Sequence, residues 1–215
     1  MGVWGDRLLP RVLDAMGAAP EVTRLRAEVC TGLHGTVLEL GFGSGLNVPH
    51  YPATVTEVLA VEPSDTAWAL SERRRAESAV PVRRSGLDGQ RLTQADDSVD
   101  CVLSTLTLCT SPDVALALAE VRRVLRPGGT LHAFEHGLAP DAGVEAWQHR
   151  LEPVQKRVFG GCHLTRDVPA LLSEAGFRLD ADAARYLEGP RMMRPWSYGR
   201  VVRASVSMAP ERDAR

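Results

Sequence analysis

The sequence predicts an α/β fold, an open, doubly wound and mostly parallel sheet of seven strands preceded by N-terminal helices. From Thr36 onward, apolar runs of strand length alternate with stretches of helix length. This alternation is typical of a parallel sheet covered by helices on both faces. A glycine-rich turn, Gly41 to Gly45, directly follows the first apolar run. The length of 215 residues and the hydrophobic content of 44% suit one domain with a sizeable core.

We expect this domain to cover residues 1–209 in three parts. Residues 1–35 form two helices: apolar residues between Leu8 and Met16 share one helical face, and Pro20 opens a second helix with Leu25 and Val29 facing inward. Residues 36–136 form a cofactor-binding core. Residues 137–209 hold an acceptor-side segment and the last strands, and residues 210–215 are a polar tail that we expect to be disordered.

Within the core, strands are predicted over residues 36–40, 57–62, 80–85, 100–106 and 130–136. Ser64 is expected to cap a helix over residues 66–78, and Ser111 to cap a helix that stops before Pro127. Residues 137–166 show no regular pattern. A helix over residues 167–176 and strands over 177–181 and 198–206 complete the fold.

The glycine-rich turn does not match the phosphate-binding loops. The dinucleotide pattern requires a third glycine at position six, where this chain has Leu46. The pattern typical of nucleoside triphosphates requires Gly-Lys-Ser/Thr, and no lysine lies near this turn. Pro49 and Pro52 interrupt the helix that would point its dipole at a pyrophosphate. An oxidoreductase that binds NAD is therefore disfavoured.

Two acidic residues indicate the kind of ligand that the turn binds. Glu62 ends the second predicted strand, where a carboxylate accepts hydrogen bonds from both hydroxyls of a ribose. Glu39 lies directly before the turn and favours a cationic group. An adenosine carrying sulfonium and ammonium groups fits both, so the sequence predicts S-adenosylmethionine as the cofactor and S-adenosylhomocysteine as its product.

The motifs in this order resemble those of the class I S-adenosylmethionine-dependent methyltransferases. "VLELGFGSG" resembles their first motif, with Glu39, Gly41, Gly43 and Gly45, and "VEP" their ribose-binding segment, with Glu62 and Pro63. The resemblance implies that Gly86 and Leu87 line the adenine and that Thr105 lies near the methionine moiety. "EVRRVLRPGGTLHAFEH" is similar to the helix, turn and strand that close the core of this family.

A narrower likeness extends almost to the end of the chain. "RPGGTLHAFEHG", "GCHLTRD" and "RPWSYGRVVRA" resemble small-molecule methyltransferases related to animal thiol methyltransferases. Those relatives carry a hydrophobic membrane-associating segment that this chain lacks. Quinone and lipid-headgroup methyltransferases share the core equally well, so the resemblance implies the methyl donor and leaves the acceptor open.

For the acceptor, we expect a hydroxyl of a small polar molecule, a sugar or a phenol, with histidine as the general base. His136 ends the fifth predicted strand on the ligand side, and His50 and His163 lie in segments that could face the acceptor. Thiol S-methylation is the alternative, because a thiol needs less activation than an alcohol. A non-catalytic module that binds S-adenosylmethionine or its product also remains open.

The composition excludes several other classes. A net charge of -2 gives no basic patch for nucleic acid. The four cysteines form no C-x-x-C pair, so neither a metal site nor a disulfide framework is expected. No apolar run is long enough to span a membrane. A cytoplasmic enzyme with a small-molecule acceptor is expected, and a homodimer is compatible with the sequence.

Overall fold

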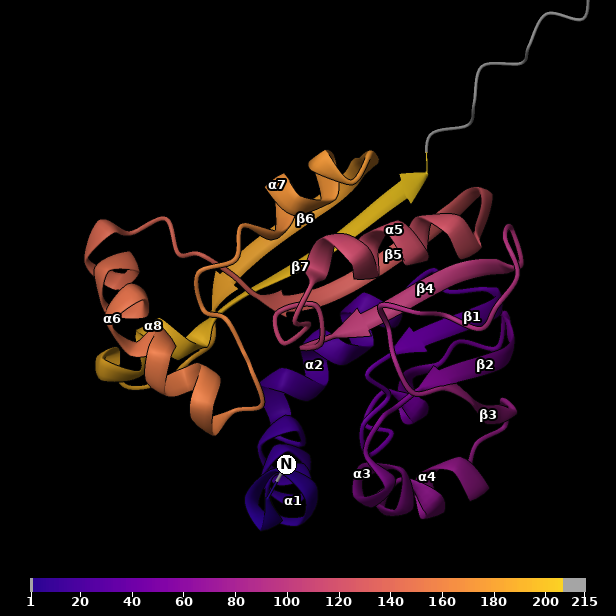
Figure 1. The fold of residues 1–215 in the computed structure, drawn as a ribbon, viewed down its shortest axis with the longest axis horizontal. Helices are drawn as coiled ribbons and strands as arrows, with labels where there is room; N and C mark the ends of the chain where they lie inside the picture. The colour runs from indigo at the N-terminus through magenta and orange to yellow at the C-terminus, as the bar shows by residue number, and fades with distance from the viewer. Residues whose placement is uncertain (1, 207–215) are drawn as a thin grey trace, which may run out of the picture.

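The computed structural model describes residues 2–206 and contains one seven-stranded sheet (Figure 1). The strands are β1 (Gly35–Leu40), β2 (Val55–Val61), β3 (Val82–Gly86), β4 (Val99–Thr105), β5 (Leu125–His136), β6 (Phe177–Tyr186) and β7 (Tyr198–Val206). All seven predicted strands are present, with their ends shifted by a few residues. The predicted tail, residues 210–215, lies outside the described residues.

The strand order in the sheet is β3-β2-β1-β4-β5-β7-β6. The first five of these strands run parallel, and β7 lies antiparallel between β5 and β6. This confirms the prediction of an open, mostly parallel, doubly wound sheet. The order reverses between β1 and β4, and in such folds a ligand binds beyond the carboxyl ends of the strands at this point.

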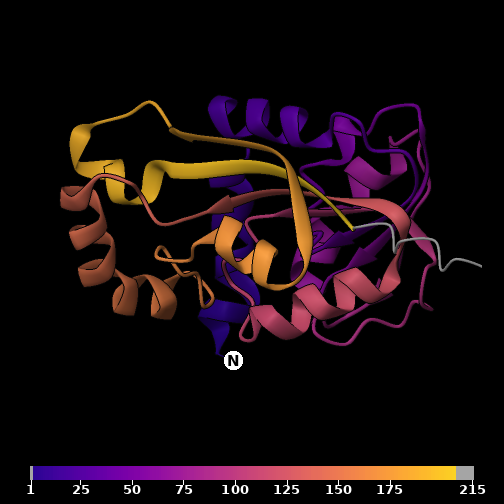
Figure 2. The ribbon, with the colours of Figure 1, turned by 90° about the horizontal axis from the view of Figure 1, so that it is seen from above.

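Helices cover both faces of the sheet. α2 (Pro20–Cys30) packs on one face, and α5 (Val114–Val124) and α7 (Val168–Glu174) pack on the other (Figure 2). Alternate strand residues supply the two cores: Val37 joins the core under α2, and Leu38 joins the core under α5 and α7. The inward positions predicted for Leu25 and Val29 are confirmed, because both side chains are buried.

Two helix starts test the N-cap residues that the sequence predicts. Ser64 caps α3 (Asp65–Leu70) as predicted, and its Oγ accepts from the Ala67 amide at 3.2 Å. The predicted long helix is divided, since a second short helix, α4 (Glu72–Ala76), follows Ser71. The prediction of Ser111 as a cap is wrong. Asp113 caps α5 instead, because its carboxylate accepts from the Leu116 amide.

The segment after β5, expected to be irregular, contains the long helix α6 (Ala142–Val158). This helix lies beyond the carboxyl ends of the parallel strands, beside α8 (Arg194–Ser197) (Figure 1). Its fully buried residues are Gln148 and Gln155 rather than apolar side chains. Hydrophobic periodicity therefore carries little signal for this helix.

The N-terminal helices span the ligand side of the sheet. A π-helical turn (Trp4–Leu8) leads into α1 (Leu9–Gly17), which contacts α3. Trp4 Nε1 donates to the Val158 carbonyl at the end of α6, at 2.9 Å. The apolar face expected between Leu8 and Met16 is formed but is mostly exposed; Leu9 is its buried member. Short 3-10 turns occupy Val48–His50 and Arg191–Met193.

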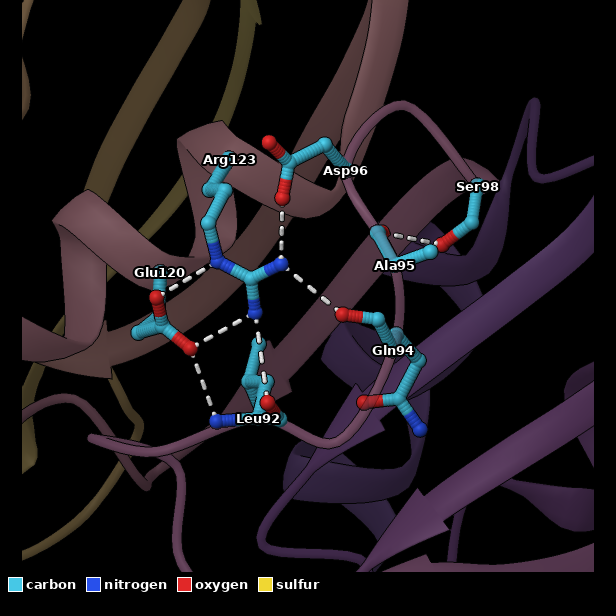
Figure 3. A network of polar contacts seen from close by, with 7 residues as sticks. All are labelled: Leu92, Gln94, Ala95, Asp96, Ser98, Glu120 and Arg123. Carbon is cyan, nitrogen blue, oxygen red and sulfur yellow. Dashed lines mark hydrogen bonds and ion pairs between the residues drawn. The ribbon is translucent and has the colours of Figure 1, made fainter.

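A polar network fastens the segment between β3 and β4 to α5 (Figure 3). The Arg123 guanidinium donates to the Leu92 and Gln94 carbonyls at 3.2 and 2.8 Å, and it pairs with Glu120 and Asp96. Glu120 in turn accepts from the Leu92 amide at 2.8 Å. The network lies where α5 ends and β4 begins, because the Asp97 and Ser98 amides donate to the Arg123 and Val124 carbonyls at 3.0 and 2.9 Å. Among the described helices, none is both long and apolar enough to cross a membrane.

Candidate active site

The predicted cofactor residues come together at the carboxyl ends of β1, β2, β3 and β4. The glycine turn follows β1, Glu62 follows β2, Gly86 ends β3 and Thr105 ends β4. Because these strands are parallel neighbours, their ends share one edge of the sheet. This edge contains the reversal in strand order between β1 and β4.

The glycine turn adopts backbone angles that favour glycine. Gly41, Gly43 and Gly45 have φ values of +62°, +60° and +76°. A Cβ atom at Gly41 would lie 2.1 Å from Thr107 Oγ1, so no larger residue fits there. A Cβ at Gly43 would meet only the Gly41 carbonyl, at 3.8 Å. The turn thus leaves open space above Gly43, where a ligand can approach the backbone.

Glu62 is aligned by two backbone amides. Its carboxylate accepts from the Gly43 and Ser64 amides, each at 2.7 Å, and the residue is 5% exposed. Burial raises the pKa of Glu62, and the two hydrogen bonds oppose that shift. Each carboxylate oxygen keeps acceptor capacity for a further donor. This arrangement fits a ribose diol held beside the glycine turn.

Glu39 belongs to a buried polar cluster beneath the same turn. Its oxygens accept from Asn47 Nδ2 at 2.9 Å and from the Tyr51 hydroxyl. Burial raises the pKa of Glu39 to about 7, the hydrogen bonds from Tyr51 and Asn47 oppose the shift, and the nearby Glu62 adds to it. The charge of Arg26 also opposes the shift. Two ionised carboxylates beside one guanidinium still leave a net negative charge, which suits the sulfonium and ammonium groups of S-adenosylmethionine.

Arg26 is a member of this cluster that the sequence did not indicate. Its guanidinium donates to Asn47 Oδ1 at 2.9 Å and to Thr105 Oγ1 at 3.0 Å, and the residue is 7% exposed. Arg26 comes from α2, so the N-terminal helix contributes directly to the site. An arginine three residues before the inward Val29 was the available signal, because that spacing places it on the buried face.

The residues expected around the adenine lie at the open side of the site. The Glu62 amide donates to the Gly86 carbonyl at 3.0 Å, which joins β2 and β3 at this edge. Leu87 is 61% exposed and Pro63 is also exposed. Exposed apolar side chains beside a buried carboxylate offer a surface for a purine ring. The chain's residues therefore fit S-adenosylmethionine at both its ribose and its cationic end.

The loop after β4 is held from below by Glu135, which the sequence did not indicate. The fully buried carboxylate accepts from the amides of Thr107, Leu108 and Cys109 at 3.0 to 3.1 Å, and from Ser104 Oγ at 2.6 Å. Leu106 in this loop has a φ of +54°, a left-handed conformation rarely adopted by a residue other than glycine. Glu135 thus fixes a strained loop at the switch point of the sheet.

The three candidate histidines lie in different surroundings, and the rings of His136 and His163 each contact another side chain. His136 Nδ1 contacts Cys162 Sγ at 3.3 Å. His163 Nδ1 pairs with Glu152 at 2.9 Å. His50 ends the 3-10 turn after the glycine loop, and burial lowers its pKa. Within the described contacts, no hydrogen bond joins these three rings to one another, and their assignment as general bases stays a prediction.

His136 belongs instead to a cluster with two cysteines. Cys162 Sγ lies 3.7 Å from Cys109 Sγ and 3.3 Å from His136 Nδ1. Both cysteines are buried. The hydrogen bond between the two thiols lowers the pKa of Cys162, which burial alone would raise. Burial alone would lower the pKa of His136, but the contact with Cys162 raises it.

Comparison with known proteins agrees with this geometry. The methyltransferase-domain family matches residues 38–133. A thiol S-methyltransferase of Rattus norvegicus is 37% identical over 79% of this chain and 66% of its own length. A thiol S-methyltransferase of Homo sapiens is 32% identical over 78% of this chain and 70% of its own length. The chain thus spans about two thirds of the length of these relatives.

Solved structures agree on the fold. The crystal structure of a SAM-dependent methyltransferase from Aquifex aeolicus superposes with a TM-score of 0.61 at 16% identity. The superposition covers 92% of this chain and 98% of the other. At that identity the likeness bears on the architecture of the sheet and its helices.

Proposed function

The chain belongs to the S-adenosylmethionine-dependent methyltransferases, and we propose that it transfers the methyl group of this cofactor to the sulfur of a small-molecule thiol. The observation that carries the proposal is the similarity to two thiol S-methyltransferases, each over more than three quarters of the chain. The site geometry supports it, because the acidic residues suit a cationic cofactor and the rings of His136 and His163 contact other side chains.

In this proposal the cofactor-binding residues act by position. Glu62 holds the ribose, Gly43 lets the ligand approach the backbone, and Gly86, Leu87 and Pro63 border the adenine. Glu39 and Thr105 lie beneath the methionine moiety, joined through Asn47. When bound, S-adenosylmethionine supplies an electrophilic methyl carbon. Holding both reactants in line provides much of the rate, because the reaction then occurs at high effective concentration.

The chemistry of a thiol makes few further demands on the protein. A thiol has a pKa of about 8.5, so a fraction is already thiolate at neutral pH. The thiolate attacks the methyl carbon, a carbon–sulfur bond forms, and the bond to the sulfonium sulfur breaks. The products are a thioether and S-adenosylhomocysteine, and the proton of the thiol goes to solvent.

A hydroxyl acceptor with His136 as general base is the competing proposal. That reaction requires a free ring nitrogen within hydrogen-bond reach of the acceptor. His136 Nδ1 contacts Cys162, and the ring also lies against the Trp196 backbone carbonyl. His163 is paired with Glu152. These contacts give the hydroxyl proposal less support than the thiol proposal.

The test is a series of thiol acceptors with different pKa values, run beside phenols and sugars. Release of S-adenosylhomocysteine is measured against pH. If a thiolate attacks without a protein base, the apparent pKa of kcat/KM shifts with the pKa of each thiol. A constant apparent pKa across the series, or turnover of phenols or sugars but not thiols, would favour a histidine base. Tight binding of S-adenosylhomocysteine without turnover of any acceptor would favour a non-catalytic binding module.

A further inference from the structure

Three side chains outside the cofactor site form a compact set of sulfur and nitrogen ligands. Cys109 lies in the loop after β4, His136 ends β5, and Cys162 lies in the loop after α6. Their ligand atoms all lie within 4.8 Å of one another. We propose that Cys109, His136 and Cys162 bind a Zn²⁺ ion with a fourth position open to an exchangeable ligand.

Two of the three separations match those of a tetrahedral zinc site, and the third, between Cys109 Sγ and the His136 ring, is no more than 4.8 Å. With bonds of about 2.3 Å to sulfur and about 2.0 Å to nitrogen, two thiolate ligands lie about 3.8 Å apart, and a thiolate and an imidazole nitrogen about 3.5 Å apart. The structure has 3.7 Å between the two sulfur atoms and 3.3 Å between Cys162 Sγ and His136 Nδ1. Cys162 therefore already lies at ligand spacing from both Cys109 and His136.

The surroundings hold each ligand in place. Glu135 accepts from the Cys109 amide, and the His163 amide donates to the Cys109 carbonyl at 2.8 Å, which brings the segment around Cys162 against the loop after β4. The His136 ring lies against the Trp196 carbonyl. A ligating histidine usually has such an outer partner, which fixes its orientation.

The charge balance also suits zinc. Binding releases one proton from each thiol, so Zn²⁺ with two thiolates and a neutral imidazole is a neutral complex. A neutral complex can be buried, whereas an unpaired ion cannot. Both cysteines are almost fully buried, at 1% and 4% exposed.

Three protein ligands leave one zinc position for an external group, as in catalytic zinc sites. Among residues 2–206, no other histidine, cysteine or carboxylate joins the cluster. The alternative occupant of this space is a disulfide between Cys109 and Cys162. That would require the sulfur atoms at about 2.0 Å and would give His136 no role.

The experiment uses the full chain, stripped with a chelator, reduced with a phosphine and titrated with Co²⁺ under anaerobic conditions. We expect one equivalent to bind, with near-ultraviolet cobalt–thiolate bands and the visible bands of tetrahedral cobalt, and Zn²⁺ to displace it. Cys109→Ser, Cys162→Ser and His136→Ala should each weaken binding by more than about 100-fold, beyond the effect typical of outer-shell changes.

Cys101→Ser is the matched control. Cys101 is also buried and contacts a histidine, with its Sγ 3.5 Å from His34 Nδ1, but it has no second thiol beside it. This variant should bind Co²⁺ like the wild type. If a ligand variant does not fold, the wild-type spectrum still decides the question. The proposal would be overturned if the thiolate bands are absent or if a Cys109–Cys162 disulfide persists after the phosphine treatment. An equal loss of Co²⁺ affinity in Cys101→Ser would also overturn it.

Discussion

Replacing Glu62 with glutamine tests the cofactor site with the least change in shape. The carboxylate accepts from the Gly43 and Ser64 amides, each at 2.7 Å. The new amide group must turn its NH₂ toward one of these donors, so one of the two hydrogen bonds is lost. A hydrogen bond to a charged group contributes about 1.5–3 kcal/mol. Without ligand, we expect Tm to fall by about 3–12 °C for a chain of this size.

The effect on ligand affinity should be larger than the effect on the fold. A bound ribose would lose one acceptor and retain a weaker one, a loss of about 2–3 kcal/mol. That corresponds to a Kd for S-adenosylhomocysteine about 30–150-fold higher. Isothermal titration calorimetry measures this value directly, and the same samples give Tm with and without ligand.

Glu57→Gln is the control on the same strand. Glu57 pairs with Arg83 at 3.3 Å, away from the glycine turn, and Arg83 is largely exposed. An exposed pair of this kind contributes at most about 1 kcal/mol, so the affinity of Glu57→Gln should equal that of the wild type. Binding by Glu62→Gln within threefold of the wild type would refute the assignment of Glu62 to the ribose.

Three further predictions concern the fold. Glu135→Gln turns an NH₂ toward one of the four donors around the buried carboxylate, and should lower the free energy of unfolding by about 2–4 kcal/mol in urea melts. An effect below about 1 kcal/mol would contradict the role of Glu135 in fixing the loop after β4. Burial lowers the pKa of His132 to about 4, so the wild type should lose about 3 kcal/mol relative to His132→Gln as pH falls from 6.5 to 4, because the unfolded chain takes up a proton at this ring that the folded chain excludes; the comparison cancels the opposite contribution of Glu39, which both proteins share, and parallel pH profiles would disprove the assignment. Arg123→Met should lower the free energy of unfolding by about 1–2 kcal/mol, because the hydrogen bonds to the Leu92 and Gln94 carbonyls are lost. Arg73→Met is the control: Arg73 belongs to an exposed ion pair, so its replacement should lower the free energy of unfolding by less than about 0.5 kcal/mol in the same melts.

The strands were predictable because each carries a dense run of apolar residues with turn residues at its ends. β4, for example, places Val99, Val102 and Leu103 in the core with no exposure. The open, mostly parallel sheet then followed from the alternation with helices. The helix α6 could not be found in this way, since it buries Gln148 and Gln155, whose amides bond backbone groups and other side chains.

That the predicted cofactor residues share one edge of the sheet was predictable for a different reason. The glycine turn and Glu62 lie at the carboxyl ends of strands. In a parallel sheet these ends share one edge, independent of how the side chains pack. Arg26 and Glu135 reach the site from other elements, and only the packing of α2 and β5 brings them there. Cys109 and Cys162 are 53 residues apart, so their contact depends on how the loop after α6 folds back.

The central claim is that this chain moves a methyl group from S-adenosylmethionine to a thiol sulfur. The most direct measurement supplies the cofactor with a trideuterated methyl group together with a small thiol, and follows the products by mass spectrometry. We predict an S-methyl thioether carrying three deuterium atoms, formed in equal amount to S-adenosylhomocysteine and greatly reduced in Glu62→Gln. A labelled ether from a phenol or sugar, with no labelled thioether from any thiol, would contradict the account.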